Sequence, residues 1–250
     1  VLVPPRSMRS LLPRVARAPL ATALLALATV AACGDDDAVT APTPAPARLK
    51  VVHAVGDAPP VDVRVDDGAA AVTGLAFRQS TPAYLVVPSG ERRLRVLPTG
   101  TQTAVIDARA TIAPEADVTV IATGRVSGGN VAPLVLVDSN TTPAAGQVRV
   151  RVVHAAATVG SVDVYVSAPG AALPASPTLA GVPFRAASGY LAVPAGSYQV
   201  RVTPAGQRGT VAIDVTTPAL PAGLVAKAIA VDPLTAGQAP TVIFTLDRVP

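Results

Sequence analysis

The segment RLKVVHA at residues 48–54 returns almost unchanged as RVRVVHA at residues 149–155. Three more blocks recur in the same order: VDVRV at 61–65 as VDVYV at 162–166, YLVVPSG at 84–90 as YLAVPAG at 190–196, and LRVLPTG at 94–100 as VRVTPAG at 200–206. The offset grows from 101 to 106 along the series, so the second copy has a net insertion of five residues, around Ala168 to Leu179. A repeat of this length predicts two copies of one domain.

Each copy has the pattern of short β-strands. Val61, Val63 and Val65 alternate with Asp62 and Arg64, as in a strand with one buried face. Pro-x-Gly turns end the strands of both copies, at 88–90, 98–100, 194–196 and 204–206. In the first copy the expected strands are 48–55, 60–66, 82–87, 92–98, 103–112, 116–124 and 131–137. The sequence therefore predicts an all-β protein with two tandem immunoglobulin-like β-sandwiches of about seven strands, at 48–140 and 147–250.

The N-terminal 32 residues are typical of a bacterial lipoprotein signal peptide. Met8, the expected true start, precedes Arg9, Arg14 and Arg17 and an apolar run that ends before Cys33. Val30, Ala31 and Ala32 before Cys33 resemble a lipobox, in which the cysteine is lipidated and becomes the mature N-terminus. Cys33 is the only cysteine of the chain, so no disulfide partner competes with this interpretation. We expect a signal helix at 1–32 and a lipid anchor in the membrane.

Residues 33–47 form the expected tether, with three aspartates at 35–37 followed by a proline-rich stretch that favours extended chain. The formal net charge of +4 comes from arginines 6, 9, 14 and 17, which precede Cys33. The mature chain is therefore electrically balanced, which argues against nucleic acid as a partner.

The repeat pattern resembles the DUF4397 family, a domain of unknown function of secreted and surface-attached bacterial proteins. The resemblance rests on the R-x-V-H-A opening, on DAPPVDV at 57–63 and on the Tyr-Leu-x-Val-Pro-x-Gly block. The second copy has ATVG at 157–160 in place of the Asp-Ala-Pro element, which leaves any role of that loop open there. The family implies an architecture and no chemistry.

Repeat-equivalent polar and aromatic residues are the first candidates for a site: His53 and His154, Asp62 and Asp163, Tyr84 and Tyr190. Each histidine ends the apolar face of a strand, which favours a structural role over that of a base or ligand. One histidine per copy is too few for a zinc site, and no G-x-S-x-G is present, so we expect neither metal, cofactor nor enzymatic activity.

Tyr165 has no aromatic counterpart in the first copy, and the alternation places it toward solvent, so it is the single candidate ligand-binding residue. The preferred hypothesis is a non-enzymatic lipoprotein of the cell envelope, periplasmic or surface-facing, that contacts a protein or the extracellular matrix. The alternative is a glycan- or solute-binding lipoprotein with its site in the loops or at the junction of the two domains.

Overall fold

The computed structural model describes residues 44–250 apart from residue 236. The expected signal peptide, lipobox and Cys33, and the tether up to residue 43, lie outside the described residues. All regular secondary structure in the described part of the chain is β-strand. No helix long and apolar enough to cross a membrane occurs there.

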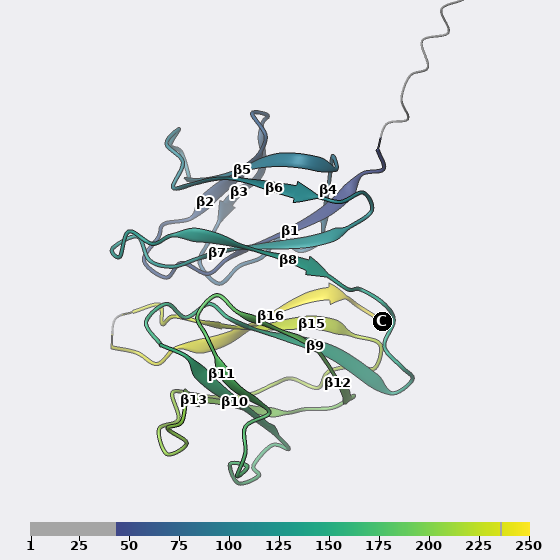
Figure 1. Ribbon diagram of the computed structural model, residues 1–250, viewed down its shortest axis with the longest axis vertical. Coiled ribbons are helices and arrows are strands. Elements are labelled where there is room, and N and C mark those ends of the chain that lie inside the picture. Colours follow the sequence, from purple (N-terminus) through teal and green to yellow (C-terminus); the bar gives the residue numbers. More distant parts are fainter. Residues whose placement is uncertain (1–43, 236) are drawn as a thin grey trace, which may run out of the picture. The chain divides into compact units, whose positions relative to one another are not determined.

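The first sandwich contains eight strands in two sheets (Figure 1). One sheet has the order β4-β1-β7-β8 and the other the order β3-β2-β5-β6. The bounds are β1 Ala47–His53, β2 Val61–Val65, β3 Ala70–Leu75, β4 Leu85–Val87, β5 Gly90–Pro98, β6 Ile106–Ile112, β7 Asp117–Thr123 and β8 Ala132–Asp138.

The second sandwich repeats this arrangement strand for strand, with orders β12-β9-β15-β16 and β11-β10-β13-β14. Its bounds are β9 Gln147–His154, β10 Val162–Ser167, β11 Leu179–Val182, β12 Ala187–Pro194, β13 Gln199–Pro204, β14 Ile213–Thr216, β15 Val225–Val231 and β16 Thr241–Arg248. The prediction of an all-β chain with two sandwiches is confirmed.

The predicted count of about seven strands per sandwich is one too low. The sequence pattern missed β3 at the edge of its sheet, which has Ala70, Ala71 and Gly74 and a burial pattern without a continuous apolar face. Its pairing with β2 shifts register twice. Such a strand is held by the hydrogen bonds of its neighbour rather than by its own side chains, so it leaves a weak signal in the sequence.

The central strands β7 and β15 are buried along their whole length. Each pairs in parallel with the first strand of its own sandwich, β7 with β1 and β15 with β9. One face of each strand points into its own sandwich, and the other contributes to an apolar cluster shared by both sandwiches. Strands covered on both faces often have continuous apolar character, as β15 does apart from Lys227, whereas β7 also buries Asp117, Thr119 and Thr123.

The shared cluster joins the sandwiches through fully buried aliphatic side chains. Val52 and Ile121 of the first sandwich pack with Val153 and Ile229 of the second, and all four side chains have no exposed surface. An interface of this composition resembles a protein core rather than a transient contact. The two sandwiches accordingly fall within one compact unit, Pro42–Pro250.

Candidate functional site

The two predicted histidines are buried, and each bonds the loop that follows its own strand. His53 donates from Nε2 to the carbonyl oxygen of Pro59 at 3.1 Å and accepts from the amide of Val55 at Nδ1. His154 contacts the carbonyl oxygen of Gly160 at 2.8 Å through Nε2. Burial lowers the pKa of both imidazoles below the ordinary value near 6.5. Both rings therefore favour the neutral state in the folded protein.

These lowered pKa values predict a pH dependence of stability. The unfolded chain binds protons at histidine from about pH 6.5 downward, whereas the folded chain resists protonation until a lower pH. The free energy of unfolding therefore falls as pH decreases between 6.5 and the folded-state pKa values. Urea unfolding of the protein and of a His53→Gln/His154→Gln variant, at matched pH values, measures this loss. We expect the decline in that window to be shallower in the variant; an equal decline would contradict the histidine origin.

Asp62 and Asp163 each accept hydrogen bonds from an edge strand and from a turn of their own sheet. Asp62 accepts hydrogen bonds from the amide of Gly74 and the hydroxyl of Thr99, and the bond from Gly74 is the main cause of its lowered pKa. Asp163 accepts from the amides of Gly181 at 2.7 Å and Gly206 at 2.9 Å. In both sandwiches the carboxylate therefore ties the edge strand to the turn after the next central strand.

Tyr84 and Tyr190 lie beside the junction of the two sandwiches. The Tyr84 hydroxyl donates to Asp138 at 2.7 Å, and burial raises the pKa of Tyr84. The Tyr190 hydroxyl accepts from the amide of Ser139, and burial raises the pKa of Tyr190 to about 12. Both phenols stay protonated at neutral pH.

Four buried charges lie between the sandwiches. Lys227 of the second sandwich bonds Asp138 of the first at 2.9 Å and Asp247 of its own sandwich at 2.5 Å. Lys50 of the first sandwich lies 3.4 Å from Asp247 and donates to the carbonyl oxygen of Leu246. All four charged side chains are at most 2% exposed. Burial lowers the pKa of Lys50 and raises that of Asp247, so these two charges depend on their partners.

Two arginines add polar contacts across the same junction. Arg78 donates to the carbonyl oxygen of Asp232 at 3.3 Å, and Arg185 donates to the Thr123 hydroxyl at 2.9 Å and to the carbonyl oxygen of Asn130. Each follows a phenylalanine and has a left-handed backbone, with φ of 68° at Arg78 and 65° at Arg185. Each sandwich thus reaches the other through an equivalent residue in an uncommon conformation. The repeated Phe-Arg pair was the sequence signal for this contact.

The Asp-Ala-Pro loop of the first sandwich is hydrogen-bonded to a neighbouring loop through the side chain of Asp57. Asp57 accepts hydrogen bonds from the amides of Val126 and Ser127 and from the Ser127 hydroxyl. Desolvation alone would raise the pKa of Asp57, but the bonds from Ser127 and Val126 outweigh it and lower the pKa to about 2. The carboxylate joins the loop after β1 to the loop after β7.

The second sandwich makes the same connection with the carboxylate on the opposite loop. Asp232, directly after β15, accepts from the amides of Ala157 and Thr158 and from the Thr158 hydroxyl. The residue directly after β7 in the first sandwich is Gly124. Loss of the Asp-Ala-Pro element in the second copy is therefore compensated by Asp232, and both loops are held.

A polar pocket of about 220 Å³ lies between these loops at the junction. It is lined by Gly56, Asp57, Arg125, Asp232, Pro233 and Leu234. The carboxylates of Asp57 and Asp232 accept hydrogen bonds from loop amides. The cationic group in the wall of the pocket is the guanidinium of Arg125, 3.7 Å from Asp57. Within the described residues, no group of three His, Cys, Asp or Glu side chains is placed to hold a metal ion.

The outer face of the β3-β2-β5-β6 sheet carries four arginines, which we call the arginine face: Arg64, Arg93, Arg95 and Arg109. Arg64 lies directly opposite Arg95, and Arg93 directly opposite Arg109. Like charges in directly opposed positions destabilise a sheet. Acidic neighbours offset part of this, because Asp107 pairs with Arg93 at 2.5 Å and Glu91 with Arg109 at 2.5 Å.

Two guanidinium groups of the arginine face remain accessible, whereas the side chain of Arg95 is only 19% exposed. The side chain of Arg109 is 71% exposed and that of Arg93 is 39% exposed. The short turn at residues 66–69 between β2 and β3 leaves the face uncovered except for contacts of Asp66 and Asp67 at its edge. Exposed ion pairs of this kind contribute little to stability, so their arginines are available to a partner.

The equivalent face of the second sandwich is covered by its own chain. The longer segment 168–178, which contains most of the predicted insertion, connects β10 to β11. Arg201, which pairs with Tyr165 across the strands, donates to the Ala171 carbonyl oxygen at 2.7 Å and to the Ser167 hydroxyl at 2.9 Å. Arg208 donates to the carbonyl oxygens of residues 173 and 174.

The expectation that Tyr165 faces solvent is wrong, because its side chain is 2% exposed. Alternation does place Tyr165 on the outer face, beside Arg201, which is 8% exposed. Strand periodicity identifies the face of a sheet and not what lies over that face, and the insertion was the signal that something covers it. Tyr165 is therefore unavailable as a stacking surface for a ligand.

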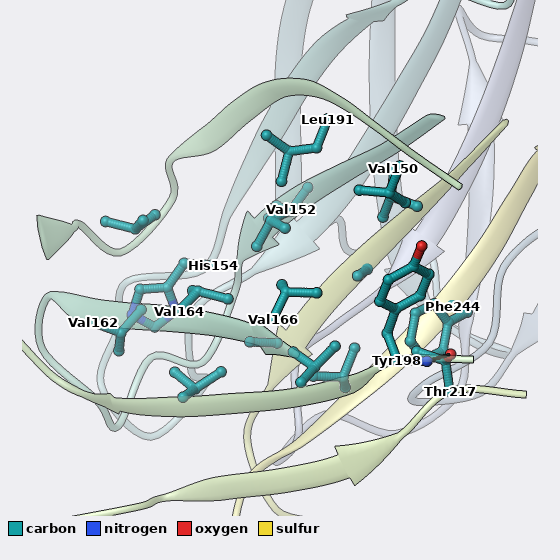
Figure 2. A pocket seen from close by; sticks show the side chains of 18 of the residues that line it. Val150, Val152, His154, Val162, Val164, Val166, Leu191, Tyr198, Thr217 and Phe244 are labelled. Atoms are coloured by element: carbon teal, nitrogen blue, oxygen red, sulfur yellow. Dashed lines mark hydrogen bonds between the residues drawn. The ribbon is translucent and has the colours of Figure 1, made fainter. Parts of the chain in front are cut away.

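The interior of the second sandwich contains an apolar cavity of about 50 Å³ (Figure 2). Tyr198, Thr217 and Phe244 lie at one end of it and His154 at the other. Valines from both sheets line its length, among them Val152 and Val164. At ~24 cal/mol per Å³, an empty cavity of this size costs about 1 kcal/mol of stability.

Comparison with known families identifies the first sandwich. Residues 47–165 match the family described as "Domain of unknown function (DUF4397)". A DUF4397 domain is found at residues 47–165. The match spans the first sandwich and the strands β9 and most of β10. No curated protein matches the chain.

Two solved structures are similar to this chain at low sequence identity. A CBM26 module from Eubacterium rectale Amy13K, in complex with maltoheptaose, is 11% identical, with a TM-score of 0.26, over 81% of this chain and 98% of that module. A family 41 carbohydrate-binding module from streptococcal virulence factors, which recognises alpha-glucan, is 11% identical, with a TM-score of 0.27, over 78% and 95%. Similarities at this level do not bear on what the present chain binds.

Proposed function

We propose that this chain is a non-enzymatic, lipid-anchored protein of the bacterial envelope that binds an acidic protein segment on its arginine face. Residues 147–250 form a second DUF4397 domain in this proposal, joined to the first through the buried junction. The observation that carries the proposal is the contrast between the two outer faces. The second sandwich covers its own face with residues 168–178, whereas the first leaves Arg93 and Arg109 open to solvent.

The covered face indicates what kind of occupant the open face accepts. Arg201 and Arg208 donate to backbone carbonyl oxygens of the overlying segment, so this side of the sheet holds a polypeptide through guanidinium donors. Arg95 of the first sandwich is equivalent to Arg201 of the second. Arg95 lies opposite Arg64 on the neighbouring strand, and Arg201 lies opposite Tyr165, the residue equivalent to Arg64. With further arginines at 93 and 109, the first face favours a segment that carries carboxylates.

Charge reversal on the arginine face tests this assignment. We expect Arg93→Glu/Arg109→Glu to weaken binding of poly-L-glutamate, measured by isothermal titration calorimetry, at least about tenfold, which corresponds to about 1.4 kcal/mol. Arg125→Glu/Arg248→Glu is the matched control, because it changes the net charge equally away from this face. We expect the control to bind within about twofold of the unmodified protein. Equal losses in both variants would show attraction to net charge and contradict the proposal.

The junction pocket supports a second candidate function, binding of an acidic solute or glycan by Arg125. Its volume of about 220 Å³ and the guanidinium of Arg125 in its wall, 39% exposed, favour this alternative. The same variants separate the two functions when polygalacturonate replaces the peptide polymer. Loss of polygalacturonate binding in Arg125→Glu/Arg248→Glu, with retention in Arg93→Glu/Arg109→Glu, would favour the junction pocket.

Lipidation of Cys33 predicts a change of fractionation. We expect Cys33→Ser to move the protein from the membrane fraction to the soluble fraction, because the acyl chains that contribute ~0.8 kcal/mol per buried methylene would be absent. Immunoblots of fractionated cells measure the distribution, with the unmodified protein as reference. A fully processed Cys33→Ser protein that still sediments with membranes would contradict the lipid anchor.

A further inference from the structure

The cavity of the second sandwich results from smaller side chains at positions that the first sandwich fills. Val65 pairs with Leu94 in the first sandwich, and Val166 pairs with Val200 in the second. The registers of the central strands place Val120 opposite Val51, and Ala228 opposite Val152. In the same sheets, Leu49 and Val118 correspond to Val150 and Ala226. Four aliphatic positions are therefore smaller in the second sandwich.

The space is only partly recovered by repacking, because Phe244 lies opposite Ala228 where the first sandwich has Val135 opposite Val120, and a cavity remains. The buried residues of the first sandwich form one cluster around Leu49, Val63, Leu94 and Val120. Those of the second form two separate clusters, one containing Val152 and Val200 and the other Val148 and Leu220. The cavity is lined by members of both clusters. Interiors are normally close-packed, so a gap that divides a core is unusual.

The lining determines the chemistry of an occupant. Apart from Tyr198, Thr217 and His154, every residue of the wall is aliphatic or phenylalanine. The Tyr198 hydroxyl already donates to the carbonyl oxygen of Pro194, the Thr217 hydroxyl accepts from the amide of Tyr198 at 3.0 Å, and His154 Nε2 contacts the carbonyl oxygen of Gly160. A water molecule needs two to four polar partners, so such a cavity favours an apolar group.

The size and the edges of the cavity narrow the occupant further. Engineered cavities of ~150 Å³ admit benzene, whereas this one is about 50 Å³ and too small for a ring. Leu191 and Val193 of β12 and Val242 and Phe244 of β16 line it and are only partly buried, so its wall reaches the surface at both edge strands. A slender group can enter from an edge without unfolding the sandwich.

We infer that the second sandwich binds the end of a saturated hydrocarbon chain in this cavity. The site is independent of the arginine face, which belongs to the other sandwich. Binding places the last carbons of the chain between the two sheets, against Val150, Val200 and Ala228, and leaves its polar end at the surface. A free fatty acid and a membrane lipid both present such a chain end.

The first sandwich supplies the variant that tests this inference. Val200→Leu/Ala228→Val introduces the residues found at the equivalent positions of the first sandwich, Leu94 and Val120, and so reduces the volume of the cavity. We expect it to raise the thermal midpoint by about 2–4 °C. The variant therefore remains folded, and loss of binding in it reports the loss of the cavity.

The measurement is methyl NMR of the valine-labelled protein, titrated with hexanoate in one arm and with phosphatidylcholine vesicles in the other. We expect saturable shifts at Val150 and Val200 in at least one arm, no shift at Val96 of the first sandwich, and no shift at Val150 in Val200→Leu/Ala228→Val. A response to hexanoate assigns the site to free chains, and a response to vesicles alone assigns it to lipid. The absence of saturable shifts in both arms, or equal shifts in the filled variant, would overturn the inference.

Discussion

Replacing Lys227 by methionine is expected to lower the free energy of unfolding by about 3–5 kcal/mol, because it leaves buried carboxylates without their main cation. Lys227 bonds both Asp138 and Asp247, and all three side chains are completely buried. Lys50 alone would then face two negative charges. Chemical denaturation followed by circular dichroism measures the change.

Two controls make this prediction specific. Arg109→Met removes one partner of an exposed ion pair with Glu91 and should cost less than about 1 kcal/mol. The double variant Lys227→Met/Asp247→Asn removes one charge of each sign and should recover a large part of the stability lost in Lys227→Met. A loss below about 1 kcal/mol in Lys227→Met would show that the junction does not bury these charges.

Truncation of the apolar junction should have an effect of similar size. Ile229→Ala removes a fully buried side chain from the cluster that contains Val52 and Ile121 of the other sandwich, and such truncations cost about 2–5 kcal/mol. Because the cluster is shared, we expect a single unfolding transition at lower denaturant, followed equally by probes in both sandwiches. Val137→Ala, at a position 69% exposed, is the control and should change stability by less than about 0.5 kcal/mol.

Separate transitions for the two sandwiches in the unmodified protein would contradict this account. They would show that the shared cluster does not couple the sandwiches. Calorimetric and van't Hoff enthalpies that agree for the whole chain would instead support one cooperative unit.

Local patterns in the sequence predicted most of the fold. Alternation in VDVRV and VDVYV, the repeated Pro-x-Gly turns and the recurrence of whole blocks sufficed for two all-β sandwiches. The eighth strand of the first sandwich was missed, because β3 is an edge strand with irregular pairing and few buried side chains. Its counterpart β11 has the same features. Formation of an edge strand depends on pairing with the adjacent strand, and a single sequence does not show which strands pair.

The candidate sites depended on contacts that the pattern does not contain. Lys50 and Lys227 lie among apolar residues of β1 and β15, Asp138 ends β8, and Asp247 is the last residue but one of β16. Those charges were visible in the sequence, but their meeting depends on how the sandwiches pack. The loop insertion was visible too, whereas the burial of Tyr165 follows from where the inserted segment folds back.

The arginine face required the strand register. Sequence spacing places Arg93 and Arg95 on one side of β5, but only the pairing of β2, β5 and β6 brings Arg64 opposite Arg95 and Arg109 opposite Arg93. Binding surfaces were expected in loops and at the junction, because loops commonly carry function. The surface that we propose for a macromolecular partner lies on the open side of a sheet, and the expectation for the loops and the junction stays a prediction.

We propose that the arginine face of the first sandwich is the binding surface, and backbone amide NMR of the protein titrated with poly-L-glutamate tests this assignment. We expect shifts concentrated on β2, β5 and β6 around Arg64, Arg93, Arg95 and Arg109, with residues 168–178 and the junction pocket unchanged. Shifts centred on Arg125 and Asp232, or spread evenly over both sandwiches, would contradict it.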